Sequence, residues 1–65
     1  METKLQKYHK ETGIKQAFIA QKVNLTPGAY SKIVRGESMP TLPVAIKIAR
    51  LLNKTVESLW GDLVE

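Results

Sequence analysis

Apolar side chains recur at helical spacing along the chain, and short runs containing Gly, Pro, Asn or Thr separate these stretches. The pattern predicts five helices and no strand, with the helices at about residues 3–12, 15–23, 27–35, 42–52 and 56–61. The second and third helices each carry an apolar stripe. In and between these two helices we expect buried side chains at Ile19, Ala20, Val23, Leu25, Ala29, Tyr30 and Ile33.

The segment between the second and third helices has the residues of a tight turn. Asn24 tolerates a left-handed backbone better than most other residues. Thr26 is a favourable N-cap, and Pro27 suits the first helical position because its missing N–H would have no partner there. Ala20 is small, so two helices can cross closely at that point. Residues 16–35 therefore predict a helix-turn-helix unit, which commonly places its second helix in the major groove of DNA.

Caps are predicted at the other helix ends as well. We expect Gly13 to close the first helix, Gly36 to stop the third, and Asn53 to form a left-handed C-cap after the fourth. Thr41 and Thr55 are the expected N-caps of the last two helices.

The fourth helix is the most apolar and is expected to be central. Its predicted apolar face consists of Leu42, Ala45, Ile46, Ile48, Ala49 and Leu52. Leu5 and Tyr8 should point inward from the first helix. Trp60 is expected to fill the far end of the core; the alternative is that Trp60, Leu63 and Val64 form an apolar edge for a second subunit.

Composition limits the class of protein. Sixty-five residues allow one domain, residues 1–65, with a small margin of stability. The absence of cysteine excludes disulfides and cysteine zinc sites, so we expect no cofactor or metal. No apolar run reaches the roughly 20 residues needed to cross a bilayer, and the N-terminus lacks an apolar signal-peptide core. We therefore expect a cytoplasmic, nucleoid-associated protein without membrane attachment.

Charge favours a polyanionic partner. The net charge is +4, and residues 1–35 hold seven cations against two acids, a balance of +5. Residues 36–65 hold three cations against four acids, a balance of −1. Positive charge thus gathers in the half that contains the predicted helix-turn-helix.

Four sets of residues resemble the phage repressor and Cro type of helix-turn-helix regulator. They are Gln16 with Ile19-Ala20, the capped third helix ending in Arg35-Gly36, Pro40-Thr41-Leu42, and the stretch from Leu51 to Trp60. All four lie in register across about residues 5–61. The resemblance implies an all-α, compact five-helix fold like the DNA-binding domain of lambda repressor, with double-stranded DNA as the partner.

The resemblance also implies contacts with backbone phosphates from Lys15, Gln16, Thr26 and Arg35. In the family, the glutamine that opens the second helix binds a phosphate, and helix N-termini favour anions. Lys15 stands where the family usually has a capping Ser or Thr. A lysine cannot cap and its charge opposes the helix dipole, but a phosphate beside it would reverse that penalty. Contacts of this kind position a protein and carry little sequence information.

Base reading is where the chain departs from the family, which uses long polar side chains on the third helix. The matching positions here are Pro27, Gly28, Ala29, Ser31 and Lys32. Lys32 can donate to guanine, and Ser31 can contact several bases. Pro27 and Ala29 offer only apolar contact, and Gly28 offers only close approach of its backbone. We therefore expect sparse direct readout, with DNA shape and deformability providing more of the discrimination.

Three more positions depart from the family pattern. Its members often join the first and third helices by an arginine–glutamate salt bridge, and the matching positions here are His9 and Val34. We expect His9 to be a surface or half-buried packing residue. Phe18 falls on a face that is polar in the family, so it is either exposed as a contact for a partner protein or packed against the first helix or the neighbouring loop.

The predicted function is sequence-specific DNA binding by a transcriptional regulator, most simply a small repressor acting as a homodimer on a near-palindromic operator. Following the family, the expected dimer surface includes Val56, Trp60, Leu63 and Val64. The alternative is a protein-interaction module of the same fold, such as an antitoxin-like or anti-repressor partner. No nucleophile–base pair, close carboxylate pair or glycine-rich phosphate loop appears, so no enzyme is expected.

Overall fold

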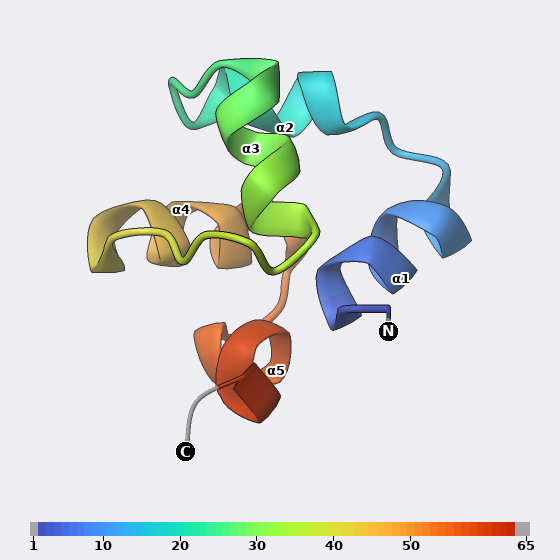
Figure 1. Ribbon diagram of the computed structural model, residues 1–65, viewed down its shortest axis with the longest axis vertical. Helices are drawn as coiled ribbons and strands as arrows, with labels where there is room; N and C mark the ends of the chain where they lie inside the picture. Colours follow the sequence, from blue (N-terminus) through green and yellow to red (C-terminus); the bar gives the residue numbers. More distant parts are fainter. Residues whose placement is uncertain (1, 64–65) are drawn as a thin grey trace.

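The computed structural model describes residues 2–63, and within them every regular element is helical (Figure 1). The helices are α1 (Lys4–Thr12), α2 (Gln16–Lys22), α3 (Pro27–Val34), α4 (Leu42–Leu52) and α5 (Val56–Trp60), followed by the 3₁₀ helix η1 (Gly61–Leu63). Each predicted α-helix occurs with bounds within one residue of the expected ones. The molecule measures 29 × 25 × 22 Å along its principal axes.

Threonine N-caps begin most of the helices. The Thr3 and Thr55 side chains each accept a bond from the third residue of their helix, and the side chains of Gln6 and Ser58 close the two capping boxes. Thr26 accepts a hydrogen bond from the Ala29 amide at 3.1 Å.

Thr41 is the exception among the threonines expected to cap helices. It occupies the N-cap position of α4 in an extended conformation, but its side chain makes no capping hydrogen bond. An N-cap oxygen bonds the amide of the second or third helical residue. The second residue of α4 is Pro43, which has no N–H. The third residue, Val44, has an N–H that Thr41 leaves unused, so the cap predicted at Thr41 is one of position only.

The turns after the helices follow the residues that tolerate a left-handed backbone. Gly13, Gly36 and the two asparagines, Asn24 and Asn53, have positive φ angles, at 74°, 80°, 60° and 56° respectively. These residues end α1, α3, α2 and α4 where the sequence predicts breaks. The predicted corner at Asn24 is thus confirmed.

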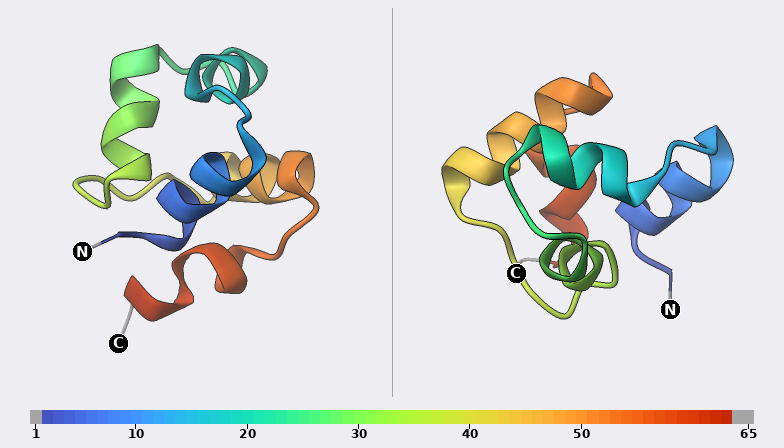
Figure 2. Two further views of the ribbon diagram at one scale, coloured as in Figure 1. Left: turned by 90° about the vertical axis from the view of Figure 1, so that its right-hand side faces the viewer. Right: turned by 90° about the horizontal axis from the view of Figure 1, so that it is seen from above.

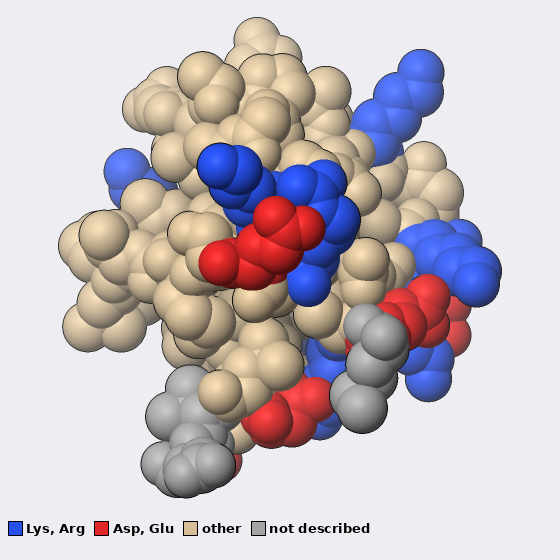
Figure 3. Space-filling model, in the orientation of Figure 1, with Lys and Arg blue, Asp and Glu red and all other residues tan. Residues whose placement is uncertain are grey.

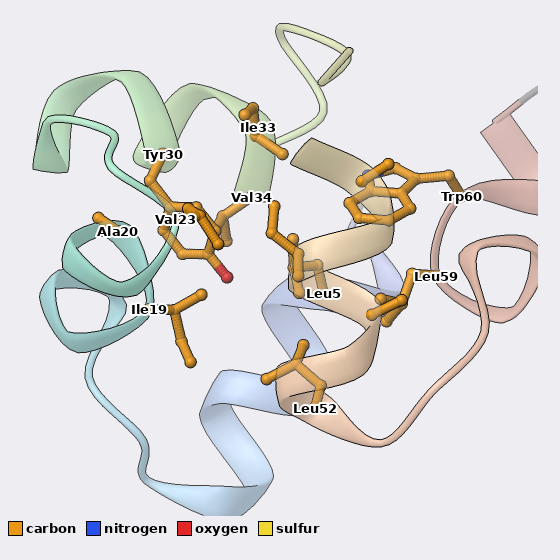
Figure 4. Packing of buried hydrophobic residues seen from close by; sticks show 13 residues of the cluster. Leu5, Ile19, Ala20, Val23, Tyr30, Ile33, Val34, Leu52, Leu59 and Trp60 are labelled. Atoms are coloured by element: carbon orange, nitrogen blue, oxygen red, sulfur yellow. The ribbon is translucent and has the colours of Figure 1, made fainter. Parts of the chain in front are cut away.

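The core is one cluster to which all five α-helices contribute (Figure 4). Its buried members are Leu5, Ile19, Ala20, Val23, Tyr30, Ile33, Val34, Ala45, Ile48, Ala49, Leu52, Leu59 and Trp60. α4 supplies four of them, Ala45, Ile48, Ala49 and Leu52, consistent with its predicted central place. Trp60 is only 3% exposed and fills the far end of the core as expected.

Four side chains expected in the core are more exposed than predicted. Leu42 is 67% exposed because it begins α4, beyond the part of the helix that packs on its neighbours. Ala29 is exposed because the buried stripe of α3 runs through Tyr30, Ile33 and Val34, the i, i+3 and i+4 positions. Leu25 and Ile46 are half-buried.

His9 is buried, which corrects the expectation of a surface or half-buried residue. Its Nδ1 lies 2.7 Å from the Ile14 carbonyl oxygen, and its Nε2 lies 2.8 Å from the Tyr30 hydroxyl. Because a carbonyl only accepts, Nδ1 carries a proton, and Nε2 of the neutral ring accepts from Tyr30. Burial raises the pKa of Tyr30, so its hydroxyl stays protonated and able to donate.

α1 is joined to α3 at a second point. The Thr3 hydroxyl donates to the Val34 carbonyl, while the Val34 side chain is fully buried. Two neutral hydrogen-bonded links, His9–Tyr30 and Thr3–Val34, thus hold together the helices that the family often joins by an ion pair. No helix in residues 2–63 is long and apolar enough to cross a bilayer.

Candidate nucleic-acid interface

The helix-turn-helix is formed by α2, α3 and the turn at Asn24. The Leu25 amide donates to the Ala20 carbonyl at 2.9 Å, which folds the chain back just after α2 ends. Ala20 is fully buried, as expected for a small residue at a close helix crossing. Figure 4 shows Ala20 and Val23 of this unit facing Tyr30 of α3.

α3 lies at one side of the molecule with its outer surface open to solvent (Figure 2, left). Pro27, Gly28, Lys32 and Arg35 are exposed, and Ser31 is half-buried. The structure therefore brings together on one outward surface the four predicted base-contacting residues and one predicted phosphate ligand. We call this surface, residues 27, 28, 31, 32 and 35, the α3 face.

The other predicted phosphate ligands lie at helix N-termini. Lys15 is the exposed N-cap residue of α2, and its side chain makes no capping bond. Gln16 is the first residue of α2 and is half-buried. Thr26 is exposed, and although its oxygen caps α3, its hydroxyl hydrogen can still be donated to an acceptor outside the chain. Amides and donors that surround helix N-termini suit anionic phosphate oxygens.

Gly28 is not explained by the packing of this protein. Its φ is not in the left-handed region, and a Cβ added to it would meet no atom within 4 Å. A glycine within a helix costs about 0.5–1 kcal/mol relative to alanine. No contact among the described residues therefore requires a glycine at this position.

The predicted phosphate ligand Arg35 is already bonded within the chain. Its Nε donates to a Glu37 carboxylate oxygen at 2.6 Å, and its Nη1 donates to the Ser31 hydroxyl oxygen, also at 2.6 Å. The hydrogen bond and charge of Glu37 raise the pKa of Arg35, and the same contact lowers the pKa of Glu37. Figure 3 shows the result as red atoms between two blue groups at the end of α3.

The loop between α3 and α4 contributes a part of this surface that the sequence did not predict. A hollow of about 560 Å³ is lined by Thr26, Gly28 and Lys32 on α3 and by Ser38, Met39 and Thr41 beyond it. Ser38 and Thr41 have hydroxyl groups beside predicted DNA ligands. Their distance from α3 in the sequence gave no signal, because only the left-handed turn at Gly36 brings the loop back against the helix.

A separate apolar groove of about 600 Å³ lies between α5, the start of α4 and the loop before α4. Its lining residues are Met39, Pro40, Leu42, Ala45, Val56, Glu57, Trp60 and Gly61. Of the residues predicted for a dimer interface, Val56 and Trp60 line this groove, and Leu63 is 43% exposed on η1. Val64 lies outside the described residues. Because Trp60 is nearly buried, it forms the floor of the groove and not a projecting edge.

Phe18 is 52% exposed, so about half of this residue is open to solvent. The Lys22 ammonium lies 5.4 Å from the ring centroid, one turn further along α2. The structure thus leaves this aromatic ring on the surface, away from the buried stripe of α2.

The comparisons with known proteins agree with this geometry. A helix-turn-helix family model matches residues 5–59, which cover the whole of α2, α3 and α4 and most of α1 and α5. A search of curated proteins finds no match. The family is one of DNA-binding transcriptional regulators of the Cro/C1 type that bind double-stranded DNA. The match extends over most of the chain, and the protein belongs to this helix-turn-helix family.

Proposed function

We propose that this protein is a sequence-specific transcriptional repressor that binds a near-palindromic operator as a homodimer. The observation that carries the proposal is the α3 face, an open helix surface with polar and small residues outward and Tyr30, Ile33 and Val34 inward. Repression requires only that a promoter be occupied, so a DNA-binding unit suffices for it.

Two protomers supply the contact area that specificity requires. One small DNA-binding module buries roughly 600–1,000 Å² of surface, and a two-fold dimer doubles this. Half-sites of such dimers lie about 34 Å apart, one helical turn of DNA. A protomer of 29 × 25 × 22 Å fits one half-site without colliding with its neighbour. The apolar groove beside α5 is our candidate surface for the second copy.

The roles proposed for individual residues divide into two kinds. Lys32 reads base edges, with smaller contributions from Ser31, Pro27 and Gly28, whereas Lys15 and Gln16 bind phosphates. Lys32→Ala is therefore expected to lower the preference for operator over scrambled DNA. Lys15→Ala and Gln16→Ala should weaken binding to every duplex, and Lys15→Ala should reduce the salt slope by about 1.

The test begins by selecting bound duplexes from a random DNA pool. A two-fold symmetric consensus is expected, and gel shifts on that consensus and on its scrambled form then compare the three variants. Equal losses on both duplexes for all three would contradict the assigned roles. An asymmetric consensus would contradict the homodimer.

A protein-interaction module is the second candidate, favoured by the exposed ring of Phe18. DNA binding driven by phosphate contacts weakens steeply between about 50 and 200 mM salt, because condensed counterions are released. A steep fall supports the repressor. A flat response, or no binding to any duplex at low salt, would support the interaction module.

A further inference from the structure

Glu37 is the acidic side chain that lies at the end of the α3 face, and its backbone is fixed there. Gly36 turns the chain in a left-handed conformation with φ of 80°. The Glu37 amide then donates to the Lys32 carbonyl at 2.9 Å, and the Gly36 amide donates to the Ile33 carbonyl. These bonds satisfy the last carbonyls of α3. The carboxylate therefore starts from a rigid helix end and not from a free loop.

The carboxylate uses the same donor that a phosphate would use. Arg35 Nε is bonded to Glu37 and Nη1 to Ser31, each at 2.6 Å, so two predicted DNA-contacting side chains are engaged within the chain. Carboxylates and phosphates are alternative partners of a guanidinium group, since both accept its planar N–H donors through charged oxygens. Because Arg35 lowers the pKa of Glu37, this carboxyl is ionised at neutral pH.

We propose that Glu37 is an intramolecular substitute for DNA phosphate, which holds Arg35 in the free protein and must release it when a duplex binds. The proposal rests on the proposed DNA-binding function of the α3 face and adds a residue that limits its affinity. Glu37 acts against DNA in two ways: it occupies the Arg35 donors, and its charge lies beside the incoming phosphates. Lys32 is the other cation whose charge acts on this carboxylate.

The size of the effect follows from the exposure of the pair. The Arg35 and Glu37 side chains are 46% and 55% exposed, so water and salt screen their attraction. Exposed ion pairs of this kind correspond to about a two- to fivefold change in an equilibrium constant. The expected consequence of removing the competitor is therefore a tightening of DNA binding by about two- to fivefold.

The test measures the affinity of five proteins, the natural sequence and four variants, for a fluorescein-labelled duplex of random sequence at low salt. Glu37→Gln should bind more tightly than the natural sequence by about two- to fivefold. Glu11→Gln is the matched control, because Glu11 is exposed on α1 and its substitution removes the same negative charge. Glu37→Gln combined with Arg35→Gln, compared with Arg35→Gln alone, shows whether the effect passes through Arg35.

Each outcome decides the proposal. A gain in Glu37→Gln that exceeds the gain in Glu11→Gln and shrinks in the Arg35→Gln background supports it. A loss of affinity in Glu37→Gln would show instead that the carboxylate positions Arg35 for DNA, and would overturn it. If Glu37→Gln raises the affinity equally in the natural and the Arg35→Gln backgrounds, Glu37 acts only through repulsion between its charge and the DNA phosphates. That result would also overturn the proposal. If the natural sequence binds no duplex at low salt, the proposed function fails first, and this inference fails with it.

Discussion

At the scale of single residues, the α3 face is distinguished by what its residues lack. The family resemblance predicts long polar side chains at the base-reading positions, whereas this protein presents a proline, a glycine and a serine with one lysine. Gly28 is the most informative of them, because the fold does not need it: the backbone is ordinary and the space around it is open. This open space is consistent with the proposed close approach of DNA to the backbone at residue 28.

Gly28→Ala separates stability from binding. We expect the free energy of unfolding to rise by about 0.5 kcal/mol, because alanine is the better helix former. Affinity for the selected operator should fall, because the new methyl group meets the DNA. Urea unfolding measures the first quantity and gel shifts the second.

The control for this variant is Gly36→Ala, which alters a glycine that the fold does require. Its φ is 80°, and a Cβ there would lie 3.2 Å from Thr3 Cγ2, so it should lower the free energy of unfolding. If Gly28→Ala binds the operator as tightly as the natural sequence does, the close approach at residue 28 is wrong.

At the scale of helices, the local sequence predicted the helix bounds well, because the residues that start or stop a helix lie at its ends. Thr26, Thr55, Asn24 and Asn53 act on bonds within four residues, so their roles can be read without knowing the fold. Thr41 occupies the N-cap position of α4 without the side-chain hydrogen bond that Thr26 and Thr55 make.

Links between distant helices were not predictable in this way. His9 was expected near the surface because its Tyr30 partner lies 21 residues away, and neither residue marks the other in the sequence. The Arg35–Glu37 pair is close in sequence, yet its effect on the α3 face depends on how Gly36 turns the chain. Local sequence therefore identified the helices. The folded arrangement of the chain determines which predicted DNA ligands are already hydrogen-bonded within the protein.

The bond between His9 and Tyr30 is expected to stabilise the packing of α1 on α3. In Tyr30→Phe the Nε2 of a buried His9 loses its partner, and leaving such a group unpaired costs about 1–3 kcal/mol. His9→Leu should cost a similar amount, since it orphans the Tyr30 hydroxyl. The double variant should cost less than the sum of the two single changes, because it removes both polar partners together.

Chemical denaturation of the three variants gives this coupling directly. Thr12→Ala is a suitable control, because its hydroxyl bond to the Tyr8 carbonyl is exposed and lies within α1. Additive losses in the double variant would mean that the two side chains stabilise α1 and α3 independently.

At the scale of the whole molecule, the distribution of charged side chains in space differs from their distribution along the sequence. The first 35 residues carry the excess of cations, but Lys47 and Arg50 of α4 line one hollow together with Lys22 of α2. Figure 2 (right), seen from above, shows α3 end-on at the lower edge of the view and α4 at the upper left. A division of charge along the sequence therefore does not separate the α3 face, our proposed DNA-binding surface, from the rest of the molecule.

The two ends of α4 provide the sharpest test of the proposed homodimer. Leu42 and Leu51 are 67% and 45% exposed, and they lie on different surfaces. Leu42 lines the apolar groove with Trp60 and Val56, whereas Leu51 lies among Lys22, Lys47 and Arg50. If a second copy covers the groove, Leu42→Lys places a charge in a closed apolar interface, while Leu51→Lys adds one more cation to a solvated surface.

Sedimentation equilibrium measures self-association, and gel shifts on full and half operators measure its consequence for DNA binding. Leu42→Lys should raise the dimer dissociation constant by at least about tenfold, since burying an unpaired charge costs more than 1.4 kcal/mol. It should weaken binding to the full operator while leaving binding to an isolated half-site nearly unchanged. Leu51→Lys should leave self-association as it is. Equal self-association of the two variants would remove the groove from the dimer interface, because only one of the two leucines lies in it.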